Sequence, residues 1–199
     1  MKANYFFIPF LILCSNLFAQ DSPSDFLKDK CSFETDGTGK SLGLKIKIAY
    51  PCIWTQANGD RPHVVKKFSY GFGDGSSIIQ SLTISKMPAT PSKKEIAELF
   101  TQEGLREMVK DLGTFISGRK VKIDGNDCGE AIVKVKRETP AATVYFYFIQ
   151  YYLIYKDKMI NIAFATGGKT ETEAKKLYDK YKLLLQTLAT NTVILSKWE

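Results

Sequence analysis

The stretch AATVYFYFIQYYLIY, residues 141–155, contains no charged residue and consists largely of aromatic and β-branched side chains. Both faces of such a strand would be apolar, which is typical of an interior strand covered on both sides. At the edge of a sheet the same strand would invite pairing with other chains and aggregation. We therefore predict a central strand here, followed by a turn at 156–158 and a last strand over 159–166.

A hairpin is predicted just before this strand, from strands over 115–123 and 129–137, in which apolar residues alternate with charged ones. The length of its connection decides which side chains share a face, because a slip of one residue flips the whole strand. Pairing Ile123 with Cys128 would mix apolar and charged residues on each face. An odd-numbered connection, which pairs Ile123 with Gly129, collects the apolar residues on one face. We predict the odd connection.

This register determines the face on which four lysines of the hairpin lie. They would lie on the same outward face and form a basic patch able to attract an acidic partner. The alternative is that lysines on strands serve solubility and the protection of sheet edges. The residues concerned are Lys120, Lys122, Lys134 and Lys136.

The remaining periodicity predicts further strands over 42–48, 63–70 and 77–86, with a polar loop over 55–62 after the first of them. Two amphipathic helices are predicted, each opened by a capping box: one over 92–112 and one from Thr170 to about Leu188. The element order is βββαββββα. This order predicts an α+β fold in which a meandering antiparallel sheet is covered by two amphipathic helices.

The N-terminus reads as an export signal. In residues 1–20, MKANYFFIPFLILCSNLFAQ, a positive residue precedes a short apolar run and a small residue at Ala19. The run is too short to span a bilayer, which needs about 20 residues. We predict cleavage after Ala19 or Gln20 and a secreted or periplasmic protein without a transmembrane anchor. A flexible segment over 21–40 and a single domain over 41–199 would follow, whose tail, 192–198, either docks on the sheet or lies loose.

Three cysteines remain after cleavage: Cys31, Cys52 and Cys128. In an oxidising compartment two of them are expected to pair. We favour Cys31–Cys52, which would join the N-terminal segment to the first strand, while a pair that includes Cys128 stays open. The chain has one histidine, and no two of these cysteines lie close together in the sequence, so we expect no metal site and no cofactor.

Several landmarks resemble the PsbP-like family. They are Ile48-Ala49-Tyr50-Pro51-Cys52-Ile53-Trp54 at the end of an early strand, Ile123-Asp124-Gly125 at a hairpin, the aromatic strand pair from Tyr145 to Phe164, and the final amphipathic helix. The resemblance covers roughly residues 41–190. That fold is shared by an extrinsic subunit of photosystem II, a small nuclear-import factor and many exported bacterial proteins. The resemblance implies a non-catalytic accessory or binding module, and it transfers no functional residue.

Charge and chemistry lead to three hypotheses about function. Loss of Lys2 with the signal lowers the net charge from +7 to +6, which favours an anionic lipid, an anionic polysaccharide or an acidic protein over nucleic acid. The first hypothesis is a non-catalytic binding module for a protein or an anionic envelope component. The second is a hydrolase or ligand-processing enzyme that uses His63 with Cys52 or another nearby group. The third is a carrier whose aromatic strand lines a small hydrophobic pocket. Trp54 could line a ligand pocket or cap the core at the end of its strand, and His63 could be a binding residue or an ordinary residue that begins a strand.

Overall fold

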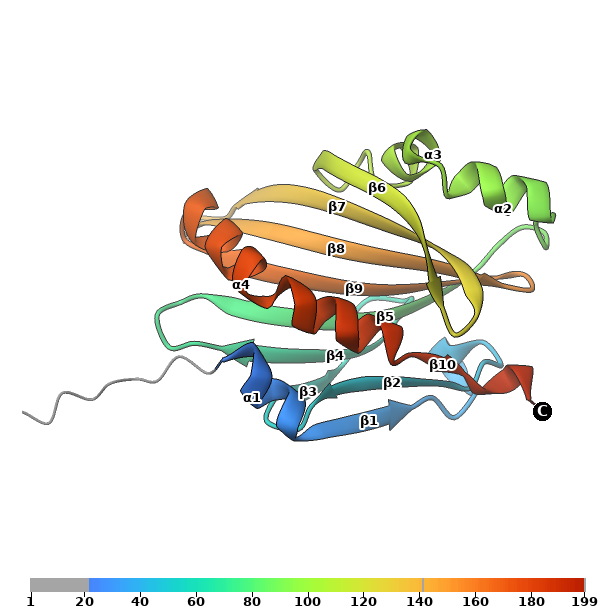
Figure 1. The fold of residues 1–199 in the computed structure, drawn as a ribbon, viewed down its shortest axis with the longest axis horizontal. Helices are drawn as coiled ribbons and strands as arrows, with labels where there is room; N and C mark the ends of the chain where they lie inside the picture. The colour runs from blue at the N-terminus through green and yellow to red at the C-terminus, as the bar shows by residue number, and fades with distance from the viewer. Residues whose placement is uncertain (1–21, 141, 199) are drawn as a thin grey trace, which may run out of the picture.

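Residues 22–140 and 142–198, which a computed structural model describes, form an α+β fold on a seven-stranded and a three-stranded antiparallel sheet (Figure 1). The strand order is β3-β4-β5-β9-β8-β7-β6 in the larger sheet and β1-β2-β10 in the smaller one. The predicted fold class is thus confirmed. The predicted signal peptide, residues 1–20, lies outside the described residues.

The strands are β1 (Lys30–Glu34), β2 (Ile46–Pro51), β3 (Thr55–Asn58), β4 (Val64–Gly71), β5 (Ser77–Lys86), β6 (Thr114–Ile123), β7 (Asn126–Glu138), β8 (Thr143–Tyr155), β9 (Lys158–Gly168) and β10 (Val193–Ile194). The α-helices are α1 (Pro23–Lys28), α2 (Lys93–Leu99), α3 (Gln102–Met108) and α4 (Glu171–Thr190), and two short 3₁₀ turns are η1 (Gly39–Ser41) and η2 (Leu195–Lys197). The predicted polar loop over 55–62 therefore contains a short edge strand, β3.

The uncharged strand β8 is central, as predicted, and pairs with β7 and β9 along its length. One face of the sheet packs against α4 and the smaller sheet, where Ile149, Tyr151 and Leu153 are buried. Part of the other face packs under α2 and α3, where Tyr152 is buried. Figure 1 shows α4 crossing the larger sheet obliquely. This double cover explains why β8 needs no polar face.

The helix predicted over 92–112 is divided into α2 and α3. Ser92 and Glu95 form the predicted capping box of α2, whereas Thr101 starts a second helix by accepting a hydrogen bond from the Gly104 N–H at 3.1 Å. A Cβ at Gly104 would lie 2.5 Å from the Glu98 carbonyl oxygen, so only glycine allows the chain to turn this tightly. The prediction of one continuous helix was wrong because it followed the apolar periodicity and overlooked this second N-cap.

The predicted register of the β6–β7 hairpin was also wrong. Ile123 pairs with Asn126, and only Asp124 and Gly125 connect the strands. Both have positive φ, 50° and 74°, which suits the two-residue type I′ turn. The premise that one face must hold every apolar residue fails here. Both faces of this hairpin are covered, so apolar residues are needed on each of them.

The segment over 21–40, predicted to be flexible, folds onto the domain from residue 22 onward. Ser22 caps α1, and the buried ring of Phe26 packs edge-on against Trp54 with centroids 6.0 Å apart. Strand β1 then pairs with β2 throughout its length. The tail also docks, since β10 pairs with β2 and Ile194 is fully buried. These segments fold because long-range partners cover them, which their own sequences do not reveal.

Candidate functional site

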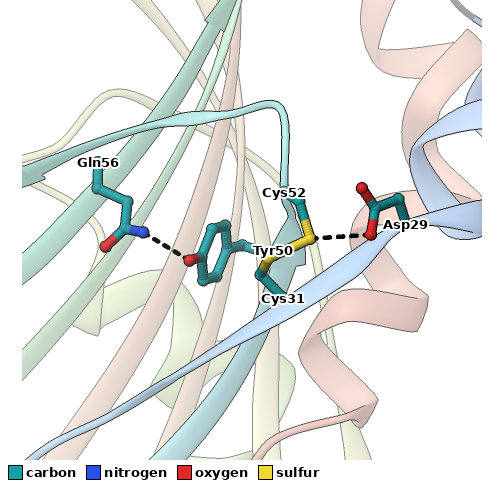
Figure 2. Close-up of a disulfide and its surroundings, with 5 residues drawn as sticks. All are labelled: Asp29, Cys31, Tyr50, Cys52 and Gln56. Atoms are coloured by element: carbon teal, nitrogen blue, oxygen red, sulfur yellow. Dashed lines mark hydrogen bonds between the residues drawn. A yellow bond between two sulfur atoms is a disulfide. The ribbon is translucent and has the colours of Figure 1, made fainter.

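The predicted disulfide between Cys31 and Cys52 is confirmed, with Cα atoms 4.9 Å apart on the neighbouring strands β1 and β2. Figure 2 shows its surroundings: Asp29 Oδ1 lies 3.2 Å from Cys52 Sγ, and the Gln56 amide donates to Tyr50 Oη at 2.5 Å. A disulfide is compatible with an oxidising compartment. Because Cys52 is in this disulfide, it has no free thiol that could form a catalytic pair with His63.

Among the described residues Cys128 is the free cysteine, and it is buried in the main hydrophobic core. Burial raises the pKa of its thiol well above the usual value, with the nearby Glu130 carboxylate adding to the effect. A thiol in this environment stays protonated and is a poor nucleophile.

Trp54 and His63 lie in different environments. The side chain of Trp54 is 2% exposed and belongs to the main core, where it closes the end of β2. His63 is exposed in the turn before β4, and its backbone carbonyl accepts a hydrogen bond from the Ile84 N–H. Within residues 22–140 and 142–198, no group of three or more histidine, cysteine, aspartate or glutamate side chains is placed to hold a metal ion.

The four lysines predicted to share a face do not do so, because the observed register separates them. Lys120 and Lys122 lie on the α2–α3 face, and Lys134 and Lys136 on the α4 face. Each has a carboxylate partner: Asp127 for Lys120 at 3.8 Å and for Lys122 at 2.6 Å, Glu171 for Lys134 at 2.9 Å, and Glu138 for Lys136 at 2.6 Å. Their role in binding stays a prediction, but not as a single patch.

A cavity beside β8 bears on the carrier hypothesis. Its volume is about 200 Å³, and its lining includes Lys134, Lys136 and Glu171. The rest of its lining includes Val135 and the aromatic Tyr145, Phe146 and Tyr147, so the carrier hypothesis stays a prediction.

A groove that the sequence did not reveal lies between the β4–β5 turn and the first turns of α4. We call it the α4 groove. It has a volume of about 310 Å³ and is lined by Phe72, Asp74, Ser76, Lys169, Glu173, Lys176, Leu177 and Lys180. Its two walls are far apart in the sequence, and the antiparallel pairing of Ser77 with Gly167 brings them together. No spacing motif in the chain could have indicated it.

The β4–β5 wall of the groove is held by local hydrogen bonds. The Asp74 carboxylate accepts from the Ser76 N–H at 2.8 Å and from the Ser76 hydroxyl at 2.6 Å. Both bonds lower the pKa of the Asp74 carboxyl, and the bond from the Ser76 hydroxyl has the larger effect. Gly75 has φ of 94°, and a Cβ there would lie 2.7 Å from Lys169 Cε, so the Lys169 side chain lies close against this turn.

The α4 wall supplies the positive charge. Thr170 caps α4, and the Glu173 carboxylate accepts a hydrogen bond from the Lys169 backbone N–H at 2.9 Å. The carboxylates of the groove are thus engaged by backbone and hydroxyl donors. In the part of the chain that the structure describes, the ammonium groups of Lys169 and Lys176 form no hydrogen bond or ion pair.

The floor of the groove is apolar. Phe72 packs against Tyr70 and Tyr181, with ring centroids 5.1 and 5.4 Å apart, and Leu177 is half-buried beside the main core. Cationic groups above an apolar floor suit a ligand that carries negative charge next to an apolar group. The lining of the groove combines charged, hydroxyl and apolar side chains and contains no histidine or cysteine.

Comparisons with known proteins give remote structural likenesses. No family model and no curated protein matches the chain. The crystal structure of LpqN from Mycobacterium tuberculosis, described as involved in cell envelope biogenesis, is similar with a TM-score of 0.48 and 11% identity, over 88% of this chain and 98% of that one. The Ran-binding protein Mog1p of Saccharomyces cerevisiae is similar with a TM-score of 0.44 and 18% identity, over 84% of this chain and 96% of that one. Membership of the PsbP-like family stays a prediction.

Proposed function

We propose that the protein is an exported, non-catalytic module that binds a protein or an anionic envelope component, with the α4 groove as its contact surface. The observation that carries the proposal is that the ammonium groups of Lys169 and Lys176 form no hydrogen bond or ion pair with the described residues, apart from the weaker effect of the Lys169 charge on the Asp74 pKa, and that both lysines line the groove together with Phe72 and Leu177. An acidic ligand would supply the missing counter-charge, and its apolar part would cover the floor.

Export is supported by the disulfide and by the predicted signal. No helix within residues 22–140 and 142–198 has the length and apolar character to cross a bilayer. The non-catalytic part of the proposal is supported by the states of the candidate reactive groups. Cys52 is in a disulfide, Cys128 is buried, and the imidazole of His63 is exposed in a turn and forms no hydrogen bond or ion pair with the described residues.

The test compares two double variants that remove the same charge. Lys169→Gln/Lys176→Gln changes the groove, whereas Lys93→Gln/Lys94→Gln changes exposed lysines at the start of α2. The probe is a fluorescent glutamate-rich peptide that carries two phenylalanines, and its binding is followed by anisotropy. We expect the groove variant to bind about tenfold more weakly, because two charge contacts of about 0.7 kcal/mol each are lost.

Equal binding by the two double variants would contradict the groove as the contact surface. The same variants can then be used as bait in extracts of the native envelope, and a physiological partner should be retained by the α2 variant but not by the groove variant. Increasing the salt concentration should weaken retention, since the contacts involved are exposed.

A further inference from the structure

One end of the molecule, which we call the C-terminal end, gathers lysines around an exposed tryptophan. It consists of Lys45, Lys86, Lys122, Lys156, Lys158, Lys197 and Trp198, with Asp124, Asp127 and Asp157. The strand registers place these residues together. Lys158 pairs with Lys86 on one side and with Tyr155 on the other. The turn at 124–125 lies at the same end of the sheet, where the Asp124 carbonyl accepts a hydrogen bond from Lys197 Nζ.

Trp198 is 78% exposed, the largest exposed fraction among the exposed large apolar side chains of the described residues. It is nevertheless held on a rigid base. Tyr155 Oη donates to the Ser196 carbonyl at 2.8 Å, the Lys45 N–H donates to Ser196 Oγ at 2.8 Å, and Lys197 Nζ bonds Asp124 at 2.7 and 3.0 Å. The indole therefore projects from an ordered turn, η2, and not from a loose tail.

The charge around Trp198 is positive. Three of the lysines are offset by the aspartates: Lys122 by Asp127, Lys158 by Asp157 and Lys197 by Asp124. Lys86 and Lys156 are exposed, and neither forms an ion pair within the described part of the chain. The Lys156 ammonium lies 5.3 Å from the centroid of the Tyr155 ring, next to the base of η2.

We propose that the C-terminal end docks on a lipid bilayer with anionic headgroups, with the Trp198 indole inserted at headgroup level. An indole has an apolar body and a polar N–H, and this combination favours the membrane–water interface. The surrounding lysines add attraction to anionic lipid, and each contributes about fivefold in binding near the surface.

The geometry also orients the docked molecule. The C-terminal end and the α4 groove lie at opposite ends of β5 and β9, since Lys86 pairs with Lys158 at one end and Ser77 with Gly167 at the other (Figure 1). Docking through Trp198 leaves the groove facing away from the bilayer. The inference does not depend on what the groove binds.

The chain contains two tryptophans with opposite exposures, which makes fluorescence a direct test. Trp54 is 2% exposed in the core and Trp198 is 78% exposed. The protein beginning at Asp21, which contains every described element, is mixed with vesicles of phosphatidylglycerol and phosphatidylcholine, or of phosphatidylcholine alone. We expect a blue shift and quenching by bromine-labelled lipid only with the anionic vesicles, and loss of both responses in Trp198→Phe.

Binding is measured separately by co-sedimentation with the same vesicles. Trp198→Ala should weaken it about tenfold, from the loss of one buried aromatic side chain, and Lys156→Gln about fivefold. The matched control is Ile53→Ala, which removes an exposed apolar side chain, 63% exposed, beyond the other end of β2. The proposal is overturned if the anionic vesicles do not bind the protein, if Trp198→Ala binds as well as the wild type, or if Ile53→Ala loses as much.

Discussion

Removing the Cys31–Cys52 disulfide should destabilise the protein by about 3 kcal/mol. The two cysteines are separated by 21 positions, and a cross-link over a loop of this length restricts the unfolded chain by about that free energy at room temperature. Few native contacts are lost with the bond, because β1 remains paired with β2 on both sides of it. The variant Cys31→Ala/Cys52→Ala should therefore keep the native fold and lose stability through its unfolded state.

Urea unfolding followed by circular dichroism measures this effect. With a denaturant dependence of about 2 kcal/mol per molar urea, the midpoint should fall by about 1.5 M. The reduced wild type should show the same midpoint as the double alanine variant. A midpoint that falls by less than about 0.5 M would refute the entropic reasoning. A separate early transition for α1 and β1 would refute the claim that pairing with β2 and the packing of Phe26 hold the N-terminal segment in place without the disulfide.

Two further predictions concern the core. Gly129→Ala should destabilise the protein by about 1–3 kcal/mol, because the added Cβ would lie 2.5 Å from Leu105 Cδ2; thermal unfolding measures the loss, and Gly71→Ala, where nothing lies within 4 Å, should change little. Burial raises the pKa of Tyr152 and Tyr178 from 10.0 to about 12, so folding favours their neutral forms. Stability should thus be constant below pH 10 and fall as the pH rises from 10 towards 12. Circular dichroism should report the loss of the fold as these two tyrosines ionise, and titration of Tyr152 or Tyr178 near pH 10 in the folded protein, assigned with the variants Tyr152→Phe and Tyr178→Phe, would contradict this prediction.

Features that depend on near neighbours were predictable from the sequence. The capping box at Ser92 and Glu95 satisfies the N–H groups of its own helix, and it is present as predicted. The uncharged strand β8 could occupy only a covered position, and it lies between β7 and β9. The favoured disulfide was correct, and it joins the N-terminal segment to the first predicted strand through the neighbouring strands β1 and β2.

Features that depend on what covers a surface were decided only by the tertiary structure. The hairpin register was mispredicted because apolar residues on both faces of β6 and β7 serve two separate cores, one under α4 and one under α2 and α3. Because the observed register differs from the predicted one, Lys120 and Lys122 lie on one face of the sheet and Lys134 and Lys136 on the other.

The segments α1, β1 and β10 are likewise ordered only because distant parts of the chain pack against them. Their short sequences bury apolar side chains only against distant segments, as Phe26 does against Trp54 and Tyr181. The α4 groove and the C-terminal end likewise combine residues that antiparallel pairing brings together from opposite halves of the chain. Local hydrogen bonds and apolar periodicity can be predicted from the sequence, because they involve residues close together in the chain. Which segment covers each face of a sheet is determined only when the whole chain packs.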